Sequence, residues 1–122
     1  MPRTFIETVV NQTVNVNYTY SSPVFNDLLG SPDELAVQVI VDNVSGSLIV
    51  YAEFQHSYLG TDDSFSAVTG TAANSGTISA PDKFWLGTPT QTRGPLGRVK
   101  VYTSTGTSGV RAIVCGRTKE IP

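Results

Sequence analysis

Few side chains of this 122-residue chain have the types and spacing that acid–base or nucleophilic chemistry needs. His56 is the only histidine, and it ends a predicted strand without the nucleophile-elbow motif of a hydrolytic triad. Cys115 is the only cysteine, and its valine-rich surroundings favour a small apolar role over a reactive thiol. Asp33 and Glu34 are adjacent carboxylates, but glycoside chemistry also needs a cleft between them. We therefore expect that the protein is not an enzyme and uses no cofactor.

A second acidic pair is the one candidate for metal binding. Asp62 and Asp63 lie in a short turn between Gly60 and Ser64, where two carboxylates are able to hold a calcium ion, as in lectin-like sandwiches. The turn lacks the alternating acidic spacing of a dedicated calcium loop, and a solvated turn with one carboxylate bonded to the backbone is favoured. The sequence predicts no metal site, with calcium at this turn as the alternative.

The elements that must position these residues are strands, and the clearest pair spans residues 35–56. Val37, Val39 and Val41 alternate with polar or outward residues, and the stretch after the Ser45–Gly46–Ser47 turn alternates in the same way. Pairing across that turn puts the three valines on one face with Val50, Ala52 and Phe54. The pattern predicts a β-hairpin within one layer of a sandwich.

A second hairpin is predicted at the end of the chain, with arms at residues 98–104 and 110–117 around a glycine-containing loop. Val99 and Val101 then share an inner face with Ala112 and Val114. The outer face of this predicted hairpin is basic and comprises Arg98, Lys100, Tyr102, Arg111, Ile113, Cys115 and Arg117.

Together these elements predict an all-β, two-sheet β-sandwich of about eight strands, most consistent with a jelly roll. An immunoglobulin-like sandwich is the alternative, although the chain has no Cys–Trp–Cys spacing. We expect a single domain, 1–122, with extended arms at Met1–Glu7 and Thr118–Pro122. Further strands are predicted at residues 4–10, 13–20, 65–69, 76–80 and 83–86.

Charge limits the classes of partner. The net charge is −2, and no nucleic-acid motif is present, so nucleic acid is not an expected partner. The segment up to Asp82 holds nine acids and one base, whereas the rest holds seven bases and one acid. Either neighbouring subunits dock acidic on basic sides, or strands of the two halves interleave and neutralise each other. The longest apolar runs are broken by Gln38, Asp42 or Glu53, so no membrane span is predicted.

Contacts with a partner are expected from aromatic and basic residues. Trp85 follows Phe84 between two prolines, and a tryptophan there either stacks on a sugar, anchors a protein interface or fills the core. The basic outer face adds cations and a tyrosine, and the amino-terminal arm adds a phenylalanine. The predicted interface residues are Phe5, Tyr51, Trp85, Arg98, Lys100, Tyr102 and Arg111.

The stretch from Leu35 to Arg117 resembles the head decoration (cement) proteins of tailed bacteriophages and related small virion sandwich proteins. The resemblance is carried by three segments, which are Asn43–Gly46 with the strand after it, the acidic turn Asp62–Asp63–Ser64–Phe65, and Gly97–Tyr102 with Val110–Arg117. In the phage proteins this turn commonly has Gly and Trp where this chain has Ser64 and Phe65.

The resemblance implies a structural role rather than a catalytic one. Such proteins bind a major capsid protein on the outer surface of the virion and clamp neighbouring capsomers, often as homotrimers. It implies synthesis in the host cytoplasm, followed by location on the capsid surface. A carbohydrate-binding sandwich from a phage tail or a cell-surface enzyme is the alternative, and an accessory subunit of another assembly is a third class.

Overall fold

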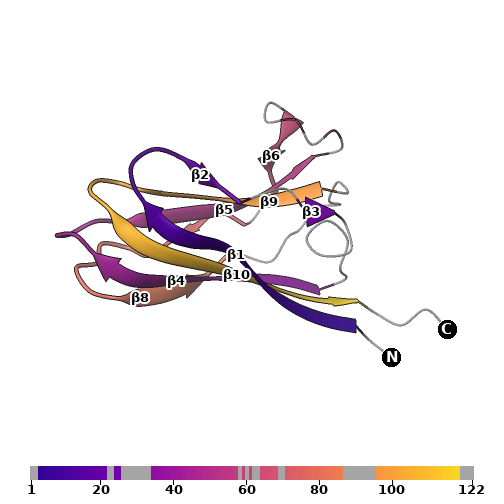
Figure 1. The fold of residues 1–122 in the computed structure, drawn as a ribbon, viewed down its shortest axis with the longest axis horizontal. Coiled ribbons are helices and arrows are strands. Elements are labelled where there is room, and N and C mark those ends of the chain that lie inside the picture. The colour runs from indigo at the N-terminus through magenta and orange to yellow at the C-terminus, as the bar shows by residue number, and fades with distance from the viewer. Residues whose placement is uncertain are drawn as a thin grey trace.

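The structure is a computed structural model that describes residues 3–21, 24–25, 34–57, 59, 61, 64–68, 71–86 and 96–118. Two antiparallel sheets pack face to face, so the predicted all-β sandwich is confirmed (Figure 1). Sheet A has the order β1 (Arg3–Val14), β10 (Ser108–Thr118), β4 (Glu34–Val44) and β8 (Asp82–Trp85). Sheet B has the order β2 (Thr19–Tyr20), β9 (Leu96–Thr103), β5 (Val50–Ser57) and β6 (Ser66–Ala67), with β3 (Val24–Phe25) also on β9 and β7 (Ala73–Asn74) also on β5.

Both predicted hairpins are wrong in their pairing. β4 lies in sheet A and β5 in sheet B, and β9 and β10 are divided between the sheets in the same way. Each pair is joined by an arch that crosses from one sheet to the other. The alternation of apolar and polar residues identifies which side chains of a strand point inward, but it does not identify the strand to which it is hydrogen-bonded. A hairpin and an arch therefore place the same side chains in the core.

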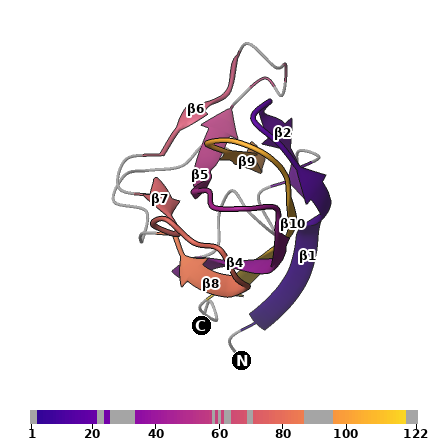
Figure 2. The same ribbon diagram turned by 90° about the vertical axis from the view of Figure 1, so that its left-hand side faces the viewer.

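The arches lie side by side at one end of the sandwich, at the left in Figure 1 and facing the viewer in Figure 2. β1, β10, β4 and β8 are neighbours in sheet A, and they continue into β2, β9, β5 and β7, which follow the same order in sheet B. Hydrogen bonds persist around the bend, since Leu48 and Ile78 exchange both backbone bonds and Ser104 donates to Ile49. The sandwich is therefore a four-stranded antiparallel sheet folded over on itself, as in a jelly roll.

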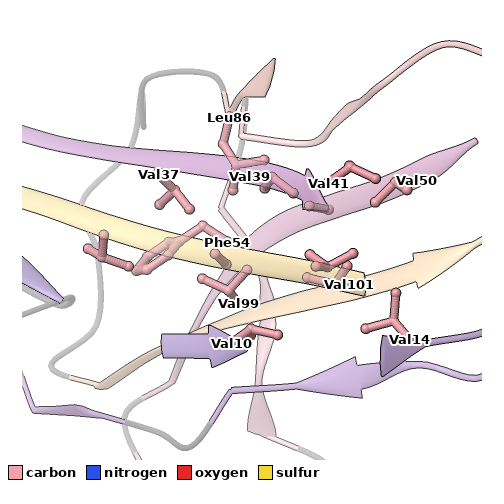
Figure 3. Close-up of a cluster of buried hydrophobic side chains, with 14 of the residues drawn as sticks. Val10, Val14, Val37, Val39, Val41, Val50, Phe54, Leu86, Val99 and Val101 are labelled. Atoms are coloured by element: carbon pink, nitrogen blue, oxygen red, sulfur yellow. The ribbon is translucent and has the colours of Figure 1, made fainter. Parts of the chain in front are cut away.

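The core lies between the inner faces of the two sheets (Figure 3). Val37, Val39 and Val41 of β4 face Val50 and Phe54 of β5, as the alternation predicts, and all are buried. β9 and β10 supply the inward residues predicted for them, and Phe84 of β8 packs against this core. The inner faces were thus predicted correctly even where the strand partners were not.

The segment expected to be an amino-terminal arm belongs to a strand from Arg3 onwards. Arg3 pairs with Thr118 and Glu7 with Val114 in the β1–β10 ladder, which shifts register between Thr8 and Val10. Residues 1–2 and 119–122, the outermost parts of the two predicted arms, lie outside the described residues. Within the described part, the start and the end of the chain pair with each other.

Candidate functional site

The predicted basic outer face does not exist as one surface. Arg98, Lys100 and Tyr102 lie on the outer face of sheet B, whereas Arg111 lies on the outer face of sheet A. The prediction failed because β9 and β10 are joined by an arch, which places their outward sides on opposite surfaces of the sandwich. The protein consequently presents two candidate surfaces.

The first surface, which we call the tyrosine face, is the outer side of sheet B around Tyr18, Tyr20, Tyr51 and Tyr102. These are four of the chain's five tyrosines. The rings of Tyr51 and Tyr102 stack, with centroids 5.0 Å apart and 17° between the planes. Tyr18 meets Tyr102 edge to face at 4.9 Å. Such ring contacts add about 0.5–1.5 kcal/mol each beyond the area that they bury.

Two cations lie among these rings. The Lys100 ammonium is 3.8 Å from the ring centroid of Tyr18 and 3.5 Å from a carboxylate oxygen of Glu53. The Arg98 guanidinium lies between two rings, 3.9 Å from the centroid of Tyr20 and 4.1 Å from that of Phe65. Cations over aromatic faces are attracted by the ring quadrupole. Two of the three bases that the sequence offers as contact residues, Arg98 and Lys100, are therefore engaged within the subunit.

Arg98 is the extreme case, because only 4% of its surface is exposed. Its Nε donates a hydrogen bond of 2.8 Å to Gln55 Oε1 on the neighbouring strand. The Arg98 side chain therefore supports the ring of Tyr20 from within the protein, and it exposes little surface to a partner.

The second surface, which we call the apolar face, is the outer side of sheet A. Ile6 of β1 is 73% exposed and Trp85 of β8 is 53% exposed, one on each edge strand. The ladder aligns Ile6 with Cys115, and Trp85 with Gln38. The half-buried outward residues of the two central strands are Ala36, Gln38, Ile40, Arg111, Ile113 and Cys115, of which Ala36, Ile40, Ile113 and Cys115 are apolar.

Arg111 lies farther along the apolar face. Its guanidinium pairs with Asp42 on β4, at 3.1 Å from Nη2 to Oδ1. Phe5, the remaining predicted contact, lies opposite Gly116 in the β1–β10 ladder, and its side chain lies outside the described residues.

The strands of the acidic segment up to Asp82 and of the basic segment after it interleave in the two sheets. β10 lies between β1 and β4, and β9 lies next to β5, so strands of the basic half adjoin strands of the acidic half in both sheets. Two ion pairs, Arg111 with Asp42 and Lys100 with Glu53, join residues of different halves. Of the two readings of the charge pattern, neutralisation within the subunit is the one that the fold supports.

The described residues contain no group of three or more His, Cys, Asp or Glu side chains that could hold a metal ion. His56 is half-buried in β5 opposite Ser66. Asp33, Asp62 and Asp63 lie outside the described residues. Over the same residues, no helix is long and apolar enough to cross a membrane.

Sequence reasoning missed Tyr18, Tyr20, Phe65 and Ile6 as surface residues of interest. The alternation of Tyr18 and Tyr20 in the sequence predicts one strand over residues 13–20. The structure ends β1 at Val14 and starts β2 at Thr19, in the other sheet. That change of sheet is what brings both tyrosines onto the same face as Tyr102.

Solved structures share this fold at low sequence identity. A structure of the infectious bursal disease virus Gx strain matches with a TM-score of 0.59 and 13% identity over 96% of this chain and 32% of that one. The PBSX exported protein XepA matches with a TM-score of 0.60 and 9% identity over 97% of this chain and 38% of that one. A VP2 subviral particle of infectious bursal disease virus matches with a TM-score of 0.53 and 14% identity over 96% of this chain and 32% of that one.

The chain thus spans about a third of the length of each of these proteins. At such identities the likeness shows the fold alone, a β-sandwich with viral jelly-roll-like neighbours. No model of a protein family and no curated protein sequence matches the chain.

Proposed function

We propose that this chain is a structural protein of a virion, which binds the outer surface of a phage capsid lattice and clamps neighbouring capsomers. The observation that carries the proposal is the apolar face, with Ile6 and Trp85 exposed on opposite edges of sheet A. Contiguous exposed apolar surface marks contact sites for other proteins, and a tryptophan is a common energetic anchor. The partner in this proposal is the major capsid protein.

The fold supports the same proposal. Proteins of infectious bursal disease virus and the PBSX exported protein XepA contain this sandwich, which is therefore compatible with particle proteins. A role on a lattice also suits a face with few exposed apolar anchors, because many equivalent sites sum modest individual affinities through high effective concentration. The proposed protein is a non-enzymatic homotrimer on the capsid surface, made in the host cytoplasm, and it binds neither nucleic acid nor membrane.

The test uses Trp85, which is the only tryptophan in the chain and so reports on the apolar face alone. We compare the wild-type protein with Trp85→Ala, with Ile6→Asn, and with Lys83→Ala as the matched control. Lys83 is exposed on the same strand and pairs with Ile40. Native mass is measured by light scattering, and binding is measured by co-sedimentation with bare phage heads.

The expected result is a trimer that binds heads for the wild-type and Lys83→Ala proteins, with loss of head binding for Trp85→Ala and Ile6→Asn. Truncating an interface anchor costs about 2 kcal/mol or more, which is roughly thirtyfold in affinity. Acrylamide quenching of Trp85 decreases on binding if the side chain becomes covered. Head binding by both variants at wild-type strength contradicts the proposal, and so does unchanged quenching in the bound state.

A further inference from the structure

Tyr18 and Tyr20 form two platforms on the tyrosine face. They are 58% and 42% exposed, yet a cation covers one face of each ring, Lys100 under Tyr18 and Arg98 under Tyr20. The exposed area therefore belongs mainly to the opposite ring face and the ring edge. Tyr18 and Tyr20 are two residues apart in an extended segment, so their side chains leave the backbone about 7 Å apart and on the same side.

The platforms are ordered before any ligand arrives. Lys100 is held by Glu53 at 3.5 Å, and Arg98 is held by Gln55 at 2.8 Å. Tyr102, stacked on Tyr51, supports the side of Tyr18. Ordering a rotamer-rich side chain at an interface costs about 0.5–1.5 kcal/mol. Rings that are already fixed avoid most of that cost.

The charge of the face favours a neutral ligand. Lys100 already pairs with Glu53, and Arg98 is almost fully covered by two rings. A phosphate-bearing ligand needs exposed cations to replace its counterions, and neither described cation of this face is so placed. Phenol hydroxyls and the Nδ2 amide of the exposed Asn74, which pairs with Tyr51 across the β5–β7 ladder and whose Oδ1 accepts from Gly76 N, offer uncharged hydrogen-bonding groups instead.

We infer that the tyrosine face binds a neutral oligosaccharide, with Tyr18 and Tyr20 stacking against successive sugar rings. A pyranose combines an apolar C–H face with a rim of hydroxyls, and a tyrosine combines an apolar ring with a polar tip. The phenols, Glu53 and Asn74 would hydrogen-bond the sugar hydroxyls. This inference goes beyond the proposed structural role and uses the opposite side of the sandwich. Capsid binding by the apolar face and sugar binding by the tyrosine face are therefore tested independently.

The experiment presents the full chain to immobilised neutral hexasaccharides, namely linear hexamers of β-1,4-glucose, α-1,4-glucose, β-1,3-glucose, β-1,4-mannose and β-1,4-N-acetylglucosamine. Affinity for any sugar that binds is then measured by calorimetry for the wild type, Tyr18→Ala, Tyr20→Ala and Tyr18→Phe. Trp85→Ala is the matched control, since it removes an exposed aromatic ring from the other face.

The expected result is binding of at least one hexasaccharide, weakened roughly 2- to 12-fold by each alanine variant because one ring contact is lost. Tyr18→Phe keeps the ring and retains more affinity than Tyr18→Ala, which separates stacking from misfolding. Trp85→Ala binds like the wild type. The inference is overturned if no hexasaccharide binds, or if the double variant Tyr18→Ala/Tyr20→Ala binds a hexasaccharide like the wild type. It is also overturned if this face binds a protein ligand but no sugar.

Discussion

Arg98 is a cation that sheet B incorporates into its own surface. It is placed outward on β9, and its guanidinium lies between the rings of Tyr20 and Phe65. A planar guanidinium stacks on rings and donates in its own plane at the same time, as the bond to Gln55 shows. A basic residue that sequence alone assigns to a partner is thus structural at this position.

Replacing Arg98 tests this role. We expect Arg98→Ala to lower the free energy of unfolding by about 2–4 kcal/mol, since desolvated cation–π contacts and a charge-assisted hydrogen bond are lost. Arg98→Lys keeps the charge but not the planar stack, so we expect it to restore less than half of that loss. Urea unfolding followed by circular dichroism measures both.

Arg111→Ala is the control for Arg98. The ion pair of Arg111 with Asp42 is exposed, and such pairs contribute about 1 kcal/mol or less. Equal losses for Arg98→Ala and Arg111→Ala would contradict the structural role of Arg98.

At the scale of elements, two arches decide how the sheet folds over. Ser45 of the β4–β5 arch and Thr107 of the β9–β10 arch are joined by four hydrogen bonds at 2.8–3.3 Å, donated by both backbone amides and by both hydroxyls. Gly46 and Gly106 have positive φ angles of 74° and 63°, which side chains rarely adopt. The two arches are therefore hydrogen-bonded to each other, in addition to the turn that each makes at its glycine.

The two glycines form a matched pair for substitution. Gly46→Ala places a Cβ in open space, whereas Gly106→Ala places it 2.8 Å from Ser45 Oγ and 3.3 Å from Ser45 O. We expect Gly46→Ala to lose about 1–2 kcal/mol of stability from left-handed backbone strain alone. Gly106→Ala loses more, because Ser45 Oγ is held by Thr107.

Thermal and urea unfolding compare the two glycine variants. Adding Ser45→Ala to both backgrounds is expected to narrow the difference between them, since the closest clashing atom is then absent. An equal loss for Gly46→Ala and Gly106→Ala in the presence of Ser45 would show that the arches are not packed as described.

At the scale of the whole molecule, the fold depends on pairings between distant parts of the chain. β1 pairs with β10, and both ends of the described chain lie side by side in Figures 1 and 2. β4 pairs with β10 and β8, and β9 pairs with β2 and β5, so the main ladders join strands far apart in sequence. Loop closure must precede most of the stabilising contacts.

We therefore expect slow refolding, with a time constant between about a millisecond and seconds, as for other sandwiches dominated by non-local pairing. Stopped-flow circular dichroism after dilution from urea measures it. Refolding within microseconds would mean that local contacts, such as the short β5–β6 pairing, and not the long-range ladders form the rate-limiting contacts.

The sequence by itself determined the class of fold and the inward face of most strands. Val37, Val39, Val41 and Phe54 were predicted to share the core and do so, because side-chain alternation is a local property of an extended backbone.

Only the tertiary structure decided which outward residues share a surface. An arch and a hairpin satisfy the same alternation, so nothing local separates Arg98 from Arg111 or joins Tyr18 to Tyr102. The choice between them is made by non-local hydrogen bonding, such as that of β10 with β1 and β4, and by burying both sheets' inner faces against each other. That choice placed the tyrosine face and the apolar face on opposite sides of the protein.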